Sequence, residues 1–76
     1  MYVRLKRKNQ TVFMYCDGAE TGQSLKTRLA QVIKKTPDEI QLLFNDKIVA
    51  DDKTLQEQRI DNDNIVLFRF RQEGAH

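Results

Sequence analysis

The chain has 76 residues, a single cysteine and a formal net charge of +2, so it is long enough for one domain and cannot form an internal disulfide. No apolar run approaches the roughly 20 residues that span a bilayer, and no signal-peptide pattern opens the chain. The sequence therefore predicts a cytoplasmic or nuclear protein in a reducing compartment, with no membrane partner. A net charge this close to balance does not predict nucleic-acid binding.

Alternating apolar residues predict a β-hairpin at the start of the chain. Residues 1–6 and 11–16 each alternate with a period of two, which is typical of a strand with one buried face. The polar stretch 7–10 joins them, and Asn9 is the residue expected to take the positive φ of a tight turn. The side chains predicted to face inward are Met1, Val3, Leu5, Val12, Met14 and Cys16.

The stretch that begins at Ser24 predicts the main helix, with Thr21 or Ser24 as its N-cap. Its apolar residues follow the i, i+4, i+7, i+8 spacing of an amphipathic helix, and Lys26 falls on the side predicted to stay in water. The helix should end before Pro37, because the residue before a proline is pushed out of the α region. The predicted buried stripe consists of Leu25, Leu29, Val32 and Ile33.

Three further strands are predicted in the second half, over residues 40–44, 47–49 and 65–71. Thr36 and Glu39 form a capping box around Pro37, which predicts a short helical turn. Thr54 and Glu57 repeat that pattern and predict a second brief helical turn. In the last strand the inward side chains are Val66, Phe68 and Phe70.

The order of these elements predicts an α+β fold of the β-grasp type. A mixed sheet of four to five strands has one main helix packed on one face, and the first and last strands lie side by side and parallel in its middle. Residues 1–71 form the domain, and residues 72–76 form a flexible polar tail.

No residue pattern predicts a catalytic, cofactor or metal site, so the chain is not expected to be an enzyme or to bind a small-molecule substrate. His76 is the only histidine and occupies the last position, where nothing holds it against a substrate. Cys16 lies on the inward side of its strand, where burial should raise its pKa and make it unreactive. Acidic pairs such as Asp51 and Asp52 read as solvated turn residues.

The outward face of the sheet is the predicted binding surface for a protein partner. Six large side chains point away from the helix there, where a half-covered sheet normally carries polar residues. Cross-strand packing among them is the alternative interpretation. Arg4 and Lys6, expected beside Arg69 and Arg71, form a basic stripe that reads as a solvated edge or a contact for an acidic protein rather than for nucleic acid. The predicted partner-binding residues are Tyr2, Arg4, Phe13, Tyr15, Leu43, Lys47, Ile65, Leu67 and Arg69.

Several short runs along residues 1–71 match one known family. They are Met1-x-Val3-x-Leu5-Lys6, Leu25-Lys26, Pro37-Asp38-Glu39, Leu42 to Lys47, Asp51 to Leu55, and Ile60. On these runs the chain resembles the ubiquitin-like proteins, and within them it is most similar to the elongin B group. That resemblance implies an adaptor that pairs with an elongin-C-like protein, or with another component of the ubiquitin pathway, in a cullin-type ubiquitin ligase. It also implies that Leu43 keeps a position of the family's binding patch, whereas Leu67 replaces a histidine and Arg69 an aliphatic residue.

Two departures from the family keep other functions open. Conjugated members end in Gly-Gly, whereas this chain has Glu73 before Gly74, so a conjugated modifier precursor is the weakest alternative. Elongin B carries a C-terminal extension that does not follow here. The chain could therefore be the ubiquitin-like domain of a larger regulatory or proteasome-associated protein, and the opening methionine would place any missing part after residue 76.

Overall fold

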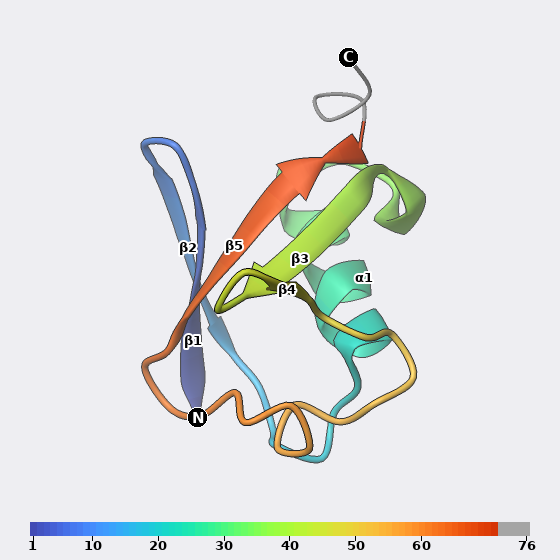
Figure 1. The fold of residues 1–76 in the computed structure, drawn as a ribbon. Helices are drawn as coiled ribbons and strands as arrows, with labels where there is room; N and C mark the ends of the chain where they lie inside the picture. Colours follow the sequence, from blue (N-terminus) through green and yellow to red (C-terminus); the bar gives the residue numbers. More distant parts are fainter. Residues whose placement is uncertain (72–76) are drawn as a thin grey trace.

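The computed structural model describes residues 1–71 and shows a mixed sheet with one α-helix across one face (Figure 1). The strand order is β2-β1-β5-β3-β4; β1 and β5 run parallel and the other neighbours antiparallel. This confirms the predicted α+β β-grasp, with five strands in the described chain. The elements are β1 (Tyr2–Arg7), β2 (Gln10–Tyr15), α1 (Gly22–Ile33), the 3-10 turn η1 (Pro37–Glu39), β3 (Ile40–Phe44), β4 (Lys47–Ile48) and β5 (Ile65–Phe70).

The inward residues of the strands build the core under α1, as the alternation predicts. Val3, Leu5 and Val66 are fully buried, and burying each such side chain contributes about 1.5–3 kcal/mol. The turn of the hairpin differs from the prediction, because Lys8 rather than Asn9 takes the positive φ, at 52°. A two-residue hairpin loop that forms a type II′ turn needs a positive φ at its first residue, and here that residue is a lysine.

The predicted helix exists, but its buried face is rotated from the one expected. Val32 is 57% exposed, whereas Lys26 is only 6% exposed, so both assignments were wrong. Each residue turns a helix by about 100°, and a face centred on Leu29 and Ile33 leaves Val32 at its margin and brings Lys26 and Ala30 inward. Lys26 tolerates this position because it has a partner on another segment.

That partner is Asp51, whose Oδ1 and Oδ2 lie 2.9 and 3.0 Å from Lys26 Nζ. Removing one member of a buried ion pair leaves the other uncompensated, whereas an apolar replacement of Lys26 avoids that cost. Because Asp51 is half exposed, we expect Asp51→Ala to lower the free energy of unfolding by about 1–2 kcal/mol, and Lys26→Met by less than about 1 kcal/mol. Urea unfolding measures both, and a larger loss for Lys26→Met would contradict this account.

The ends of α1 follow from local capping. Of the two predicted caps, Thr21 is the one used, since its Oγ1 accepts a hydrogen bond from the Ser24 backbone N–H at 3.1 Å. At the other end Lys34 adopts the left-handed conformation, at φ 60°, and its N–H bonds to the Ala30 carbonyl. The helix therefore ends before Pro37, as predicted. The capping box of Thr36 and Glu39 is also present.

The second capping box is present, but no helix follows it. Glu57 accepts from the Thr54 N–H at 2.9 Å, and Thr54 Oγ1 accepts from the Glu57 N–H at 3.1 Å. The chain turns back at once because Arg59 adopts φ 63° and the Ile60 N–H bonds to the Leu55 carbonyl. The predicted helical turn is thus a series of hydrogen-bonded turns. Within residues 1–71, no helix has the length and apolar character needed to cross a membrane.

Candidate docking surface

The outward face of the sheet carries two separate groups of apolar side chains. The first, the aromatic group, consists of Tyr2, Phe13 and Tyr15 on β1 and β2, with exposed fractions of 55%, 67% and 60%. Tyr2 and Tyr15 are paired across the strands, with ring centroids 5.2 Å apart in an edge-to-face arrangement. Their contact leaves more than half of each side chain in water.

The second group, the aliphatic row, crosses β5, β3 and β4. Leu43 lies opposite Leu67 on one side and opposite Ile48 on the other, so the three side chains adjoin. Leu67 is 48% exposed and Ile48 62%, while Leu43 is half-buried between them. Ile65, 43% exposed, lies on the same face two residues before Leu67. A contiguous apolar surface of this kind is typical of a binding site.

Ile48 was missed by sequence reasoning, although the signal was present. Val49 is buried, so alternation along this short segment places Ile48 on the opposite, outward side. The strand β4 has only two residues, and this shortness hides the alternation.

Arg4 and Lys6 on β1 separate the two groups, and the predicted basic stripe is only partly formed. Arg4 is paired with Asp63: its Nη2 donates to the Asp63 carbonyl at 2.9 Å, and its Nε lies 3.3 Å from Asp63 Oδ1. The β1–β5 register sets Arg4 beside Ile65, so Arg69 and Arg71 lie further along β5 than expected. The stripe is incomplete both because of this register and because the loop before β5 supplies an acid, Asp63, that the strand pattern does not reveal.

Arg69 is also tied to the sheet, since its Nε donates to the Gln41 side-chain oxygen on β3 at 2.6 Å. It therefore marks the polar border of the aliphatic row.

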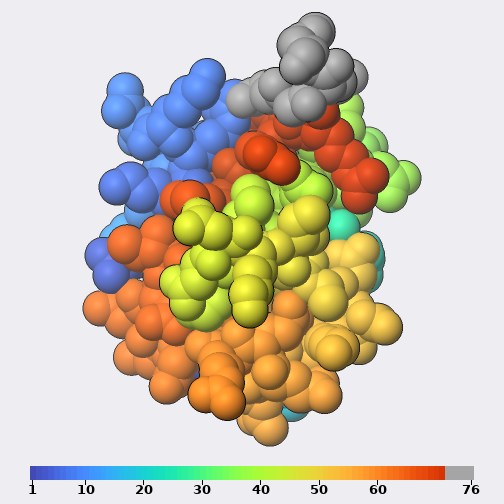
Figure 2. Space-filling model, in the orientation of Figure 1, coloured from blue at the N-terminus to red at the C-terminus, as the bar shows by residue number. Residues whose placement is uncertain are grey.

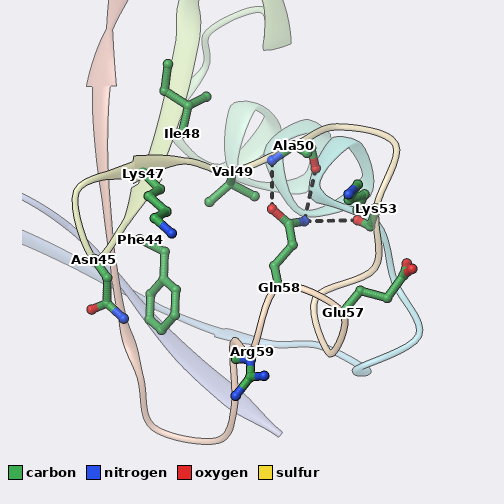
Figure 3. Close-up of a pocket in the computed structure, with 10 residues that line it drawn as sticks. All are labelled: Phe44, Asn45, Lys47, Ile48, Val49, Ala50, Lys53, Glu57, Gln58 and Arg59. Carbon is green, nitrogen blue, oxygen red and sulfur yellow. Dashed lines mark hydrogen bonds between the residues drawn. The ribbon is translucent and has the colours of Figure 1, made fainter.

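Lys47 lies apart from the other predicted residues. It pairs with Phe44 and lines a hollow at the β4 edge of the sheet, between the β3–β4 turn and residues 53–59 (Figure 3). We call this hollow of about 430 Å³ the edge groove. The turn and residues 55–60 adjoin on one face of the molecule (Figure 2). The lining residues are Phe44, Asn45, Lys47, Ile48, Val49, Ala50, Lys53, Glu57, Gln58 and Arg59.

Cys16 is 1% exposed, and burial raises its pKa, with the Glu20 carboxylate adding to the effect. We therefore expect Cys16 to resist an aromatic disulfide reagent in the folded protein and to react fully in denaturant, because the thiolate is the reacting form.

The raised pKa of Cys16 also makes the stability of the fold depend on pH. The contribution of this thiol to the free energy of unfolding should be retained below the ordinary thiol pKa and fall as the pH rises through the folded value. A colorimetric thiol assay across this pH range measures reactivity; rapid labelling of folded protein near neutral pH would overturn this expectation.

Across residues 1–71, no three histidine, cysteine, aspartate or glutamate side chains come close enough to hold a metal ion. Glu57 has a lowered pKa, first because the Thr54 backbone N–H donates to it and then because the Thr54 hydroxyl does, so its charge serves the capping box. His76 and the predicted tail lie outside the described residues.

The comparison with protein families agrees with this fold. The family model of the ubiquitin family matches residues 1–73. The chain therefore belongs to the ubiquitin family. No curated protein matches it in a sequence search.

Proposed function

We propose that this chain is a non-catalytic interaction module that docks a protein partner through the outward face of its sheet. The observation that carries this proposal is the aliphatic row: three adjoining side chains on three strands, two of them about half exposed or more. Exposed aliphatic surface costs free energy in water, and a partner that covers it recovers about 25 cal/mol per Å². The aromatic group adds rigid side chains of the type that anchor interfaces.

The more specific proposal is an elongin-B-like adaptor that pairs with an elongin-C-like protein in a cullin-type ubiquitin ligase. It rests on the sequence runs at residues 25–26, 34–39 and 51–55. In the fold these runs form the start of α1, the capped turn before β3 and the loop that carries Asp51. These runs stabilise the fold of the domain, whereas the outward face of the sheet contacts the protein partner.

Calorimetric titration with recombinant elongin C tests this proposal. We expect the double variant Leu43→Ser, Leu67→Ser to bind at least about 30-fold more weakly than the native chain, because a central apolar anchor is worth about 2 kcal/mol and two neighbouring anchors lose at least that much together. The matched control is Val32→Ser, since Val32 is also an exposed aliphatic residue but lies on α1. We expect this control to bind like the native chain.

Two results would count against the proposal. An equal loss of affinity in Val32→Ser would move the contact from the sheet to the helix. No binding of elongin C, together with binding of a proteasomal ubiquitin receptor that depends on Leu43 and Leu67, would favour the ubiquitin-like domain of a larger protein. The docking face would then be the same, but the partner class would differ.

A further inference from the structure

The edge groove has a rim of positive charge that one carboxylate, that of Glu57, offsets only in part. Lys47, Lys53 and Arg59 line it, and within residues 1–71 none of them takes part in an ion pair. Glu57 is the one acid in the lining, and its carboxylate already accepts from the Thr54 N–H and hydroxyl at 2.9 and 3.0 Å. The groove therefore presents an excess of two positive charges to a ligand.

The groove also has an apolar part between its cations. The Phe44 ring points into it, between Lys47 and Arg59 (Figure 3). Ile48 lines the same hollow and is 62% exposed. A ligand that suits both parts needs an apolar side chain and negative charge close together, which is the chemistry of an acidic peptide rather than of an isolated anion.

Gln58 fixes the side of the groove that lies opposite the β3–β4 turn. Its Oε1 accepts from the Ala50 N–H at 2.7 Å, while its Nε2 donates to the carbonyls of Ala50 and Lys53 at 3.1 Å each (Figure 3). The polar atoms of this side chain all bond to the backbone of the loop. Gln58 therefore fixes the shape of the groove and is not expected to bind the ligand. A preformed groove lowers the ordering cost of binding.

We propose that the edge groove binds an acidic peptide segment with a central apolar residue. Carboxylates of the segment contact Lys47 and Arg59, and the apolar residue packs on Phe44 and Ile48. Ile48 belongs to both the groove and the aliphatic row, so a partner seated on the row can extend such a segment around the β4 edge. The inference thus deepens the proposed function, but a free peptide tests it independently.

The probe is the capped peptide acetyl-Glu-Glu-Phe-Glu-Glu-amide, titrated into the native chain with amide-resolved NMR. We expect saturable shifts in residues 44–48 and 53–59, and binding that weakens as salt rises from about 0.05 to about 0.5 M. The same peptide with glutamine in place of glutamate should bind at least about tenfold more weakly. Equal binding of the two peptides would overturn the proposal.

Charge-neutralising variants separate a specific groove from general attraction to cations. We expect Lys47→Gln, Arg59→Gln to weaken peptide binding at least about tenfold. The control Lys8→Gln, Lys34→Gln removes the same charge at exposed residues elsewhere; Lys34, at φ 60°, also matches the backbone of Arg59, at φ 63°. This control should bind like the native chain, and an equal loss in it, or shifts centred on Lys8 and Lys34, would overturn the proposal.

A third variant distinguishes this proposal from the docking proposal. The double variant Leu43→Ser, Leu67→Ser removes two side chains of the aliphatic row but leaves the lining of the edge groove, Ile48 included, in place. We expect it to retain peptide binding within about twofold while losing the protein partner. Loss of the peptide in this variant would show that the groove has no binding capacity of its own.

Discussion

Replacing Gly22 with alanine is expected to lower the free energy of unfolding by about 3 kcal/mol, at the upper end of the usual cost of overpacking. A Cβ at this position would lie 2.3 Å from the Ala50 carbonyl oxygen and 2.9 Å from Val49 Cγ1. The carbonyl belongs to the backbone and cannot move away alone, because Gln58 binds both the N–H and the C=O of Ala50. The first turn of α1 would therefore have to separate from this loop.

Thermal and urea unfolding measure the effect, and a loss of this size should lower Tm by roughly 12–24 °C in a domain of this length. Gly18→Ala is the matched control. Its nearest neighbour would be the Gln56 Oε1 at 3.3 Å, the end of a flexible side chain, so we expect a change below about 1 kcal/mol. Equal stability of the two variants would mean that α1 and the loop are not in close contact at Gly22.

Gln58→Met is expected to cost about 2–3 kcal/mol, although methionine has nearly the same volume and stays within the same packing. The substitution removes the side-chain partner of the Ala50 N–H and of the Ala50 carbonyl, whereas the Lys53 carbonyl keeps the hydrogen bond that it accepts from the Gly22 N–H. The Ala50 N–H and carbonyl are partly buried, and each polar group that loses its partner there costs about 1 kcal/mol or more. The loop between β4 and residue 59 should loosen before the sheet does.

Native-state hydrogen exchange of the Ala50 amide gives the local readout. We expect its protection to fall in Gln58→Met while the amides of β1 keep theirs under conditions where the variant is folded. The control is Gln56→Met, because Gln56 is exposed and its side chain makes no hydrogen bond within residues 1–71. Unchanged protection at Ala50 in Gln58→Met would show that another group holds this loop.

Strand positions and their faces could be predicted because a strand alternates with a fixed period of two. The spacing that predicts α1 identifies its axis well, but it places the face less well. The choice between Val32 and Lys26 depends on Asp51, a residue from a distant loop whose charge makes the burial of Lys26 tolerable. Periodicity cannot show such a partner.

The edge groove could not be predicted, since its two sides come from separate segments, residues 44–50 and 53–59. Its form depends on Gln58 reaching back to Ala50 and on the left-handed backbone at Arg59. A glutamine and an arginine carry no local signal for either role. The loss of the predicted basic stripe depends in the same way on Asp63, which lies in a loop and neutralises Arg4.

The outward face of the sheet, and not the helix face, is the surface that we propose contacts the partner. A methyl-resolved NMR titration of the native chain with elongin C tests this proposal most directly, because Leu43, Ile48 and Leu67 report on one face and Val32 on the other. We expect the methyl groups of these three sheet residues to shift and broaden while those of Val32 stay unchanged. Shifts confined to Val32 and its helix neighbours, with the sheet methyl groups unmoved, would contradict the account.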